Sequence, residues 1–288
     1  MLEDLRLSGD IDNKDGASCV IRSVEDQVND LMCYLQRFGS AAPRQAFYVA
    51  ARYTEFTGWL YQDVGDLNAA MYWSNTALDL ARQAEDGQLA SYIWMRKSNI
   101  ASDARLPVLA AIYAESGEHE TASLRPKVQG ALLRQKAHAF ALSGDRSVAE
   151  RALERAFVCA GRDDANEDNF AGYCTEEFVE MEAAHCWIEL EHYDEALPTL
   201  ERAVEDWDLD FSRDLSLGLA RLATLHAGVG DTESAGLSVR RSLGIVAESG
   251  SRRAIQQLQR SISLLPPCDE SDQLRREVVA ATRIGVTP

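Results

Sequence analysis

The chain has 288 residues, of which 46% are hydrophobic and 26% are charged, and its formal net charge is −17. These proportions are ordinary for a soluble globular protein. The excess of acidic residues disfavours nucleic acid as a partner, because its phosphates attract Lys and Arg. A basic or cationic partner suits the charge better, although many soluble proteins are acidic without having such a partner.

Neither a signal peptide nor a membrane span is recognisable in the sequence. Residues 1–20 lack a basic start followed by an apolar core, and no apolar run approaches the roughly 18 residues that cross a bilayer. The six cysteines include no C-x-x-C pair, which favours free thiols in a reducing compartment. We therefore expect a cytoplasmic protein that makes no contact with membranes.

The pattern of helices begins after an acidic start. Residues 1–20 are rich in Gly and Asp and poor in apolar residues, which predicts a disordered or loosely packed lead-in. From Ser23 onward, apolar residues recur at steps of three and four and predict a helix. Further helices are expected at about 44–63, 67–84, 88–102, 106–116, 124–142, 146–159, 176–190, 194–206, 213–228, 232–248, 251–264 and 270–283.

Four turns between these helices resemble one another. They end in Ala70, Ala149, Ala196 and Ala235, at intervals of 79, 47 and 39 residues, and three of them begin with Gly-Asp. Glycine can end a helix in the left-handed conformation, and aspartate can cap the next one. The turn at 191–194 has no glycine, so we expect it to be built differently. Since the first interval is about twice the last, a degenerate copy is expected near Ala110.

Such a regular spacing of turns is typical of helical-hairpin repeats. We predict an all-α, tetratricopeptide-like superhelix that forms a single α-solenoid over residues 21–288. It should contain about five helix pairs, a leading helix and a capping helix near the C-terminus. Arrays of this kind work through the surface around which they curve.

Three stretches are similar to a known family. They are Glu55–Asp63 with the Gly-Asp turn that follows, Tyr92–Ser98, and a closing stretch from Arg213 to Arg252. Together they resemble the tetratricopeptide-type C-terminal sensor region of actinobacterial helix-turn-helix (XRE-type) transcriptional regulators, over about residues 20–265. The resemblance implies a region that senses a peptide or small metabolite, or that dimerises.

In that family a separate N-terminal helix-turn-helix domain binds DNA. Such a domain needs a recognition helix with basic and amide side chains. Residues 1–40 are too short and too acidic to supply one. We therefore expect no direct binding of nucleic acid by this chain.

Six side chains are candidate ligand contacts, on two helices that should line the concave side. They are Tyr92, Arg96, Asn99, Arg134, Gln135 and His138. Long basic and amide side chains can hold the carboxylate or main chain of a peptide. Arg96 can alternatively pair with Glu55 or Asp63 and join two layers of the array.

Metal and cofactor sites are weakly indicated. Cys159, Cys174, His185 and Cys186 are ligand types that zinc accepts, but their spacing matches no compact zinc motif. The acidic loop 163–169 has part of a calcium pattern but lacks the glycine and the final glutamate. We predict no metal and no cofactor.

No catalytic motif is present in the sequence. We expect a non-enzymatic regulatory module that binds a peptide, a small metabolite or a protein partner on its concave face, linked to transcriptional regulation. The alternative is an interaction scaffold or a homodimerisation module without a small ligand. An enzyme, which would need a closed pocket with a perturbed acid or histidine, is the third option.

Overall fold

The computed structural model describes residues 1–162, 170–205, 207 and 212–284. Within them the chain forms α-helices and two short 3-10 turns, and no strand. The helices are α1 (Leu2–Asp15), α2 (Ile21–Phe38), α3 (Arg44–Asp63), α4 (Leu67–Gln83), α5 (Gly87–Asp103), α6 (Pro107–His119), α7 (Pro126–Leu142), α8 (Arg146–Ala160), α9 (Glu176–Glu189), α10 (Tyr193–Glu205), α11 (Ser212–Gly228), α12 (Thr232–Ser249), α13 (Arg252–Leu264) and α14 (Asp269–Ile284). None of these described helices is long and apolar enough to cross a bilayer.

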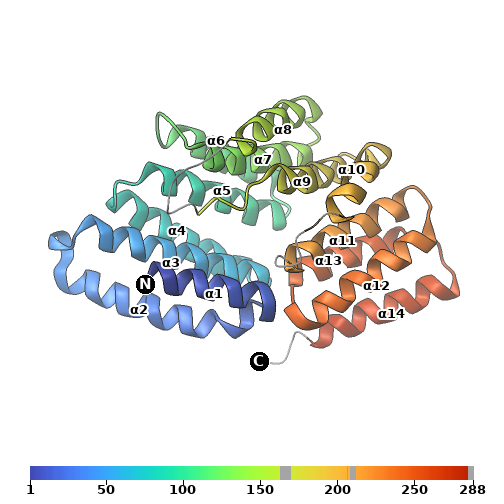
Figure 1. Cartoon of the computed structure of the whole chain (residues 1–288), viewed down its shortest axis with the longest axis horizontal. Helices are drawn as coiled ribbons and strands as arrows, with labels where there is room; N and C mark the ends of the chain where they lie inside the picture. Colours follow the sequence, from blue (N-terminus) through green and yellow to red (C-terminus); the bar gives the residue numbers. More distant parts are fainter. Residues whose placement is uncertain (163–169, 206, 208–211, 285–288) are drawn as a thin grey trace.

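Consecutive helices pack as antiparallel pairs from α3–α4 to α11–α12, followed by α13 and α14. The pairs follow an arch that rises from α3 and α4 through α7 and α8 and descends to α11–α14 (Figure 1). The first helix of each pair forms the inner layer, and α5, α7 and α11 are almost wholly buried there. The prediction of an all-α array of helix pairs is confirmed.

The turn between helices recurs more often than its sequence motif does. Its left-handed residue is Gly65, Glu85, Arg105, Gly144, Glu191 or Gly230. The expectation that the turn at 191–194 is built differently is wrong, because Glu191 has a φ of 62° and takes the place that glycine has elsewhere. The degenerate copy expected near Ala110 is the turn between α5 and α6, and Ala110 is fully buried.

Buried alanines mark where paired helices cross. Those at the ends of the repeated turns have no exposed surface: Ala70, Ala110, Ala149, Ala196 and Ala235. Small side chains at these positions let the backbones of two helices approach closely, and larger side chains fill the space between layers.

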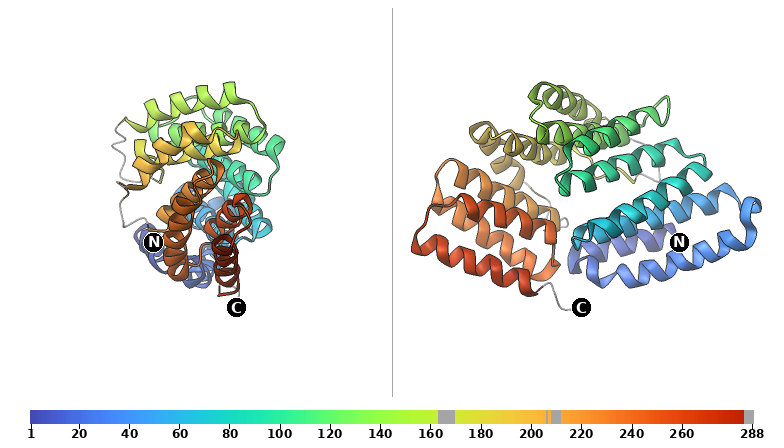
Figure 2. Two further views of the ribbon diagram at one scale, coloured as in Figure 1. Left: turned by 90° about the vertical axis from the view of Figure 1, so that its right-hand side faces the viewer. Right: turned by 180° about the vertical axis from the view of Figure 1, so that it is seen from behind.

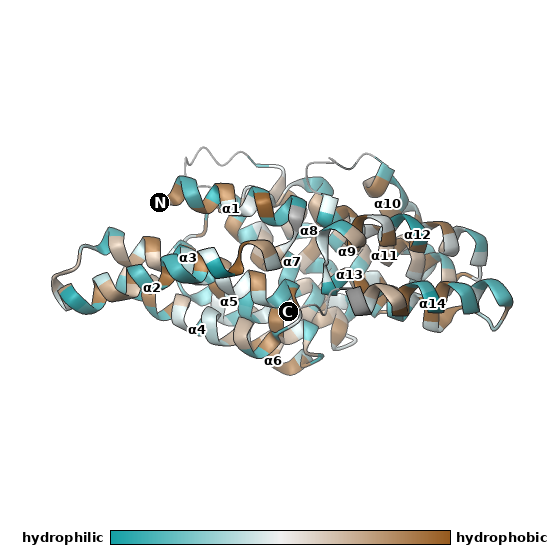
Figure 3. Cartoon of the chain, turned by 90° about the horizontal axis from the view of Figure 1, so that it is seen from below, coloured by the Kyte–Doolittle hydropathy of each residue, from teal (hydrophilic) through white to brown (hydrophobic). Residues whose placement is uncertain are grey.

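Helix α1 corrects the prediction of a loosely packed lead-in. Residues 2–15 are helical, and Leu5 and Asp12 are buried. Gly16 ends the helix at a φ of 86°, so close to α12 that an added Cβ would lie 2.0 Å from the carbonyl oxygen of Ser249. Figure 3 shows α1 on one side of the paired helices. Because the apolar pattern of α1 is weak, contacts with distant residues hold the helix in place.

The two ends of the arch touch (Figure 2). The Ser251 hydroxyl, at the start of α13, donates a hydrogen bond of 3.1 Å to the Asp63 carboxylate at the end of α3. Beside it, the Arg253 guanidinium lies 3.6 Å from the carboxylate of Asp103 on α5. The inner helices of both arms therefore face the same concave space.

Candidate functional site

A cavity of about 670 Å³ lies between α1 and the inner helices. Side chains of α1, α3, α5, α7, α9, α11 and α13 line it, together with Phe170 and Tyr173 from the segment before α9. One wall of the cavity is α1 itself, so the chain covers its own concave side.

The structure brings the six predicted contacts to three different places. Four of them line this cavity: Tyr92, Arg96, Asn99 and Arg134. Gln135 is fully buried and lines no cavity described here. His138 lines a second cavity, together with residues of α5, α9, α11 and α13.

Arg96 makes the ion pair with Glu55 that the sequence offers as one alternative, and it also lines the cavity. Its guanidinium lies 3.2 Å from the Glu55 carboxylate, and both side chains are about nine-tenths buried. It also faces the ring of Trp59, at 4.3 Å from the centroid. Burial raises the pKa of Glu55, although the charge of Arg96 opposes this shift. Arg96 thus joins α5 to α3 and at the same time forms part of the cavity wall.

A chain of amide hydrogen bonds crosses the inner layer. The Gln62 amide donates to Asn99 at 2.6 Å, and the Asn99 amide donates to Gln135 at 2.9 Å. Gln135 also donates to Ser102 at 3.1 Å and accepts from Arg134 at 3.0 Å. Since Gln135 touches Asn99 and Arg134 but not the cavity, it orients cavity residues from behind.

Tyr92 forms part of an aromatic wall. Its hydroxyl lies 3.3 Å from the Tyr173 hydroxyl, and its ring packs edge-on against Phe170 at 5.1 Å between centroids. Burial raises the pKa of Tyr92 well above its ordinary value. The hydroxyl therefore remains neutral and can donate a hydrogen bond.

Three arginines gather around Trp59, and the sequence analysis identified only one of them. The guanidiniums of Arg96, Arg213 and Arg253 lie 4.3, 4.7 and 5.2 Å from the ring centroid. The indole N–H donates to Asp12 at 3.1 Å, and Arg213 also hydrogen-bonds to that carboxylate. Burial raises the pKa of Asp12 against the opposing charge of Arg213. The signal that could have indicated Arg213 is its position at the start of α11, a helix rich in leucine and alanine.

The Glu182 carboxylate binds two arginines within the inner layer of helices. Its carboxylate accepts from Arg134 at 3.0 Å and from Arg221 at 2.6 Å, and all three side chains are buried. Burial alone would raise the pKa of Glu182, but the charges of Arg221 and Arg134 hold it well below its usual range. The carboxylate is therefore ionised and links α7, α9 and α11.

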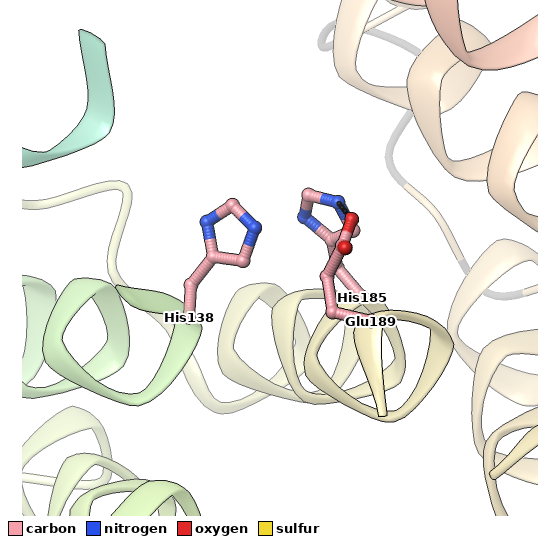
Figure 4. Close-up of side chains that lie close together, drawn as sticks. All are labelled: His138, His185 and Glu189. Atoms are coloured by element: carbon pink, nitrogen blue, oxygen red, sulfur yellow. Dashed lines mark ion pairs between the residues drawn. The ribbon is translucent and has the colours of Figure 1, made fainter. Parts of the chain in front are cut away.

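The second cavity has a volume of about 320 Å³ and contains a histidine pair. His138 and His185 point toward one another with ring centroids 4.1 Å apart, and Glu189 lies beside His185 (Figure 4). Burial lowers the pKa of both histidines, most strongly that of His138. Among the described residues, His138, His185 and Glu189 form a group whose ligand atoms lie within 4.8 Å of one another.

The cysteines considered in the sequence play a different part. Cys174 and Cys159 both lie near Gly130, while Cys186 is fully buried. Burial raises the pKa of each of these thiols, which makes them poor thiolate ligands. The acidic loop 163–169 lies outside the described residues.

Comparisons with known proteins identify the fold. No family model matches the sequence, and no curated protein matches it. Among solved structures, BtubC (BKLC) from P. vanneervenii is similar, with a TM-score of 0.52 and 18% identity over 81% of this chain and 91% of that chain. The chain is a tetratricopeptide-like helical repeat protein. Folds of this kind present an extended concave surface.

Proposed function

We propose that this chain is a non-enzymatic regulatory module that binds a short peptide or a small metabolite in the cavity beneath α1. The observation that carries the proposal is the cavity of about 670 Å³ on the inner face, whose lining combines charged and aromatic side chains. Ligand sites commonly have volumes of about 300–1,000 Å³. The resemblance of residues 20–265 to the sensor region of helix-turn-helix regulators supports a role in transcription, exerted through a partner.

The charges around the cavity suit a ligand that carries both signs. Six arginines and six carboxylates line it, so the wall offers sites for an anionic and a cationic end. Arg96 and Arg134 can receive a carboxylate in charge-assisted bonds, and Tyr92 and Asn99 can bond to peptide groups. A short peptide has all of these features, whereas a polyanion would meet the six acids.

Helix α1 provides a route by which binding could change the outer surface. Asp12 connects α1 to Trp59 on α3 and to Arg213 on α11. A ligand carboxylate that takes the place of Asp12 at Arg213 would remove this link between α1 and both arms of the arch and so weaken the hold on α1. Such a ligand shifts the equilibrium between covered and open states by its difference in affinity for the two.

Native mass spectrometry of the protein from its own host tests this proposal. We expect a non-covalently retained small ligand that Arg96→Gln loses. Arg155→Gln, which changes an exposed arginine of α8, should retain it. Circular dichroism establishes that the Arg96 variant is folded. A bare wild-type mass, together with unchanged hydrogen exchange in α1 when a small-molecule extract of the host is added, would contradict the proposal.

A second candidate, a dimerisation or scaffold module without a small ligand, is favoured by an apolar stripe on α6. Val108 is 72% exposed and Ile112 is 51% exposed, one helical turn apart, and Leu106 lies just before them at 50%. Exposed apolar patches of this kind often mark protein interfaces. Light scattering of wild type and of Val108→Glu tests this candidate: a dimer that the substitution dissociates supports it, and a wild-type monomer opposes homodimerisation.

A further inference from the structure

The second cavity differs from the first in its charge. It lies between α5, α7, α9, α11 and α13, and its lining contains four arginines but only two carboxylates. The charged residues are Arg105, Arg221, Arg253, Arg260, Asp103 and Glu189. A positive site stands out on a chain whose net charge is −17.

The carboxylates of this region are shared between arginines. Glu189 accepts from Arg105 at 2.8 Å and from Arg260 at 2.5 Å. Behind the cavity wall, Glu182 accepts from Arg221 and from Arg134. Arg253 has the Asp103 carboxylate at 3.6 Å. Among these described residues, five guanidiniums (those of Arg105, Arg134, Arg221, Arg253 and Arg260) thus meet three carboxylates, and an excess of about two positive charges remains. Arg221 is buried and Arg260 is about one-third exposed, whereas Arg105 lies mostly at the surface. An anion in the cavity would therefore be attracted mainly by Arg221 and Arg260, where water screens the charge least.

A metal ion fits the same residues less well. The Arg221 guanidinium lies 2.8 Å from His185 Nδ1, and because a guanidinium can only donate, Nδ1 must accept. The proton of the neutral ring then sits on Nε2, which faces Glu189 at 3.6 Å. Both nitrogens of His185 and the Glu189 carboxylate are thus engaged, and a divalent cation would add to the positive charge.

We propose that the second cavity binds a small phosphate monoester. A phosphate group carries a charge of about −1.5 to −2 at neutral pH, which matches the local excess, and its oxygens suit the fork of donors on an arginine. Arg221, Arg253 and Arg260 line the cavity on α11 and α13, and Gln256 and Gln257 offer amide groups to a polar body. Because Leu217 and Arg253 line both cavities, a test of this site must use residues that belong to one cavity only.

Isothermal titration calorimetry with glycerol 3-phosphate, in a phosphate-free buffer of fixed ionic strength, tests the proposal. We expect saturable binding of one molecule per chain, and none of glycerol. Arg260→Gln should weaken the binding tenfold or more, by about 1.5 kcal/mol or more for a lost charged hydrogen bond. Arg155→Gln, outside the cavity, and Arg96→Gln, in the other cavity, should bind as wild type does. Melting curves establish that each variant is folded.

Three results would overturn the assignment. One is the absence of saturable binding for both glycerol 3-phosphate and inorganic phosphate. Another is binding that Arg260→Gln and Arg105→Gln leave unchanged. The third is tight binding of Zn²⁺ that His138→Gln abolishes, because the histidine group would then be a metal site. Each of these results leaves the ligand of the first cavity as a separate question.

Discussion

Replacing Glu182 by alanine should destabilise the inner layer strongly. The substitution leaves Arg134 and Arg221 without their shared carboxylate, and both guanidiniums are buried. Loss of one partner from a buried ion pair costs about 3–5 kcal/mol, and with two arginines affected we expect about 5 kcal/mol. At a urea dependence of about 2–3 kcal/mol per molar, the denaturation midpoint followed by circular dichroism should fall by about 2 M.

Two further variants make this result interpretable. Glu154→Ala changes an exposed glutamate on α8 and should alter stability by only about 0.5 kcal/mol. Glu182→Leu combined with Arg221→Met replaces one charge pair by apolar groups of similar size and should recover part of the loss. A loss below about 1 kcal/mol for Glu182→Ala would refute the view that this carboxylate compensates two buried charges.

Three other predictions concern α1, the turns and pH. Gly16→Ala would place a Cβ 2.0 Å from the Ser249 carbonyl oxygen and should increase hydrogen exchange throughout α1, whereas Gly9→Ala, with no atom within 4 Å of the new Cβ, should leave exchange unchanged. Glu191→Gly should raise the free energy of unfolding by about 1 kcal/mol, because a left-handed residue other than glycine is strained by about that amount; an unchanged urea midpoint would argue against strain at this turn. Burial lowers the pKa of His138 from 6.5, so the unfolded chain binds more protons below pH 6.5 and the stability present above that pH is lost as the pH falls. His138→Gln should flatten the decline measured by urea titrations between pH 7 and 5, and an equal decline in both proteins would count against a neutral buried histidine.

The repeat architecture could be predicted because its signals are local. A left-handed residue, a capping aspartate and an alanine four residues later lie within one turn, and so they are visible in the sequence. The turn at Glu85 was missed, and the conformation of the turn at Glu191 was predicted wrongly, because both residues adopt the left-handed conformation without being glycine. The neighbouring turns impose this left-handed conformation, since each helix pair must cross the next at a similar angle.

Helix α1 and most of the cavity could not be predicted for the opposite reason. Asp12 has its partners at Trp59 and Arg213, and Arg213 is 201 residues away. Whether such residues meet depends on the curvature of the whole array. That curvature is the sum of small rotations between successive helix pairs. Arg96 and Asn99 were found because they belong to one inner helix, whereas Arg213 joins them only once the arch is closed.

Polar contacts help to close the arch, and this bears on how the protein can work. Ser251 with Asp63, Arg253 with Asp103, and Asp12 with Arg213 hold α13, α5, α3, α1 and α11 together. Polar pairs of this kind add little net stability, because desolvation offsets most of their attraction, but they fix which groups meet. A ligand with a carboxylate or an amide can make the same hydrogen bonds and ion pairs as such a contact, and so can replace it. Opening an apolar interface would expose apolar surface to water, which costs free energy. The polar closure avoids that cost.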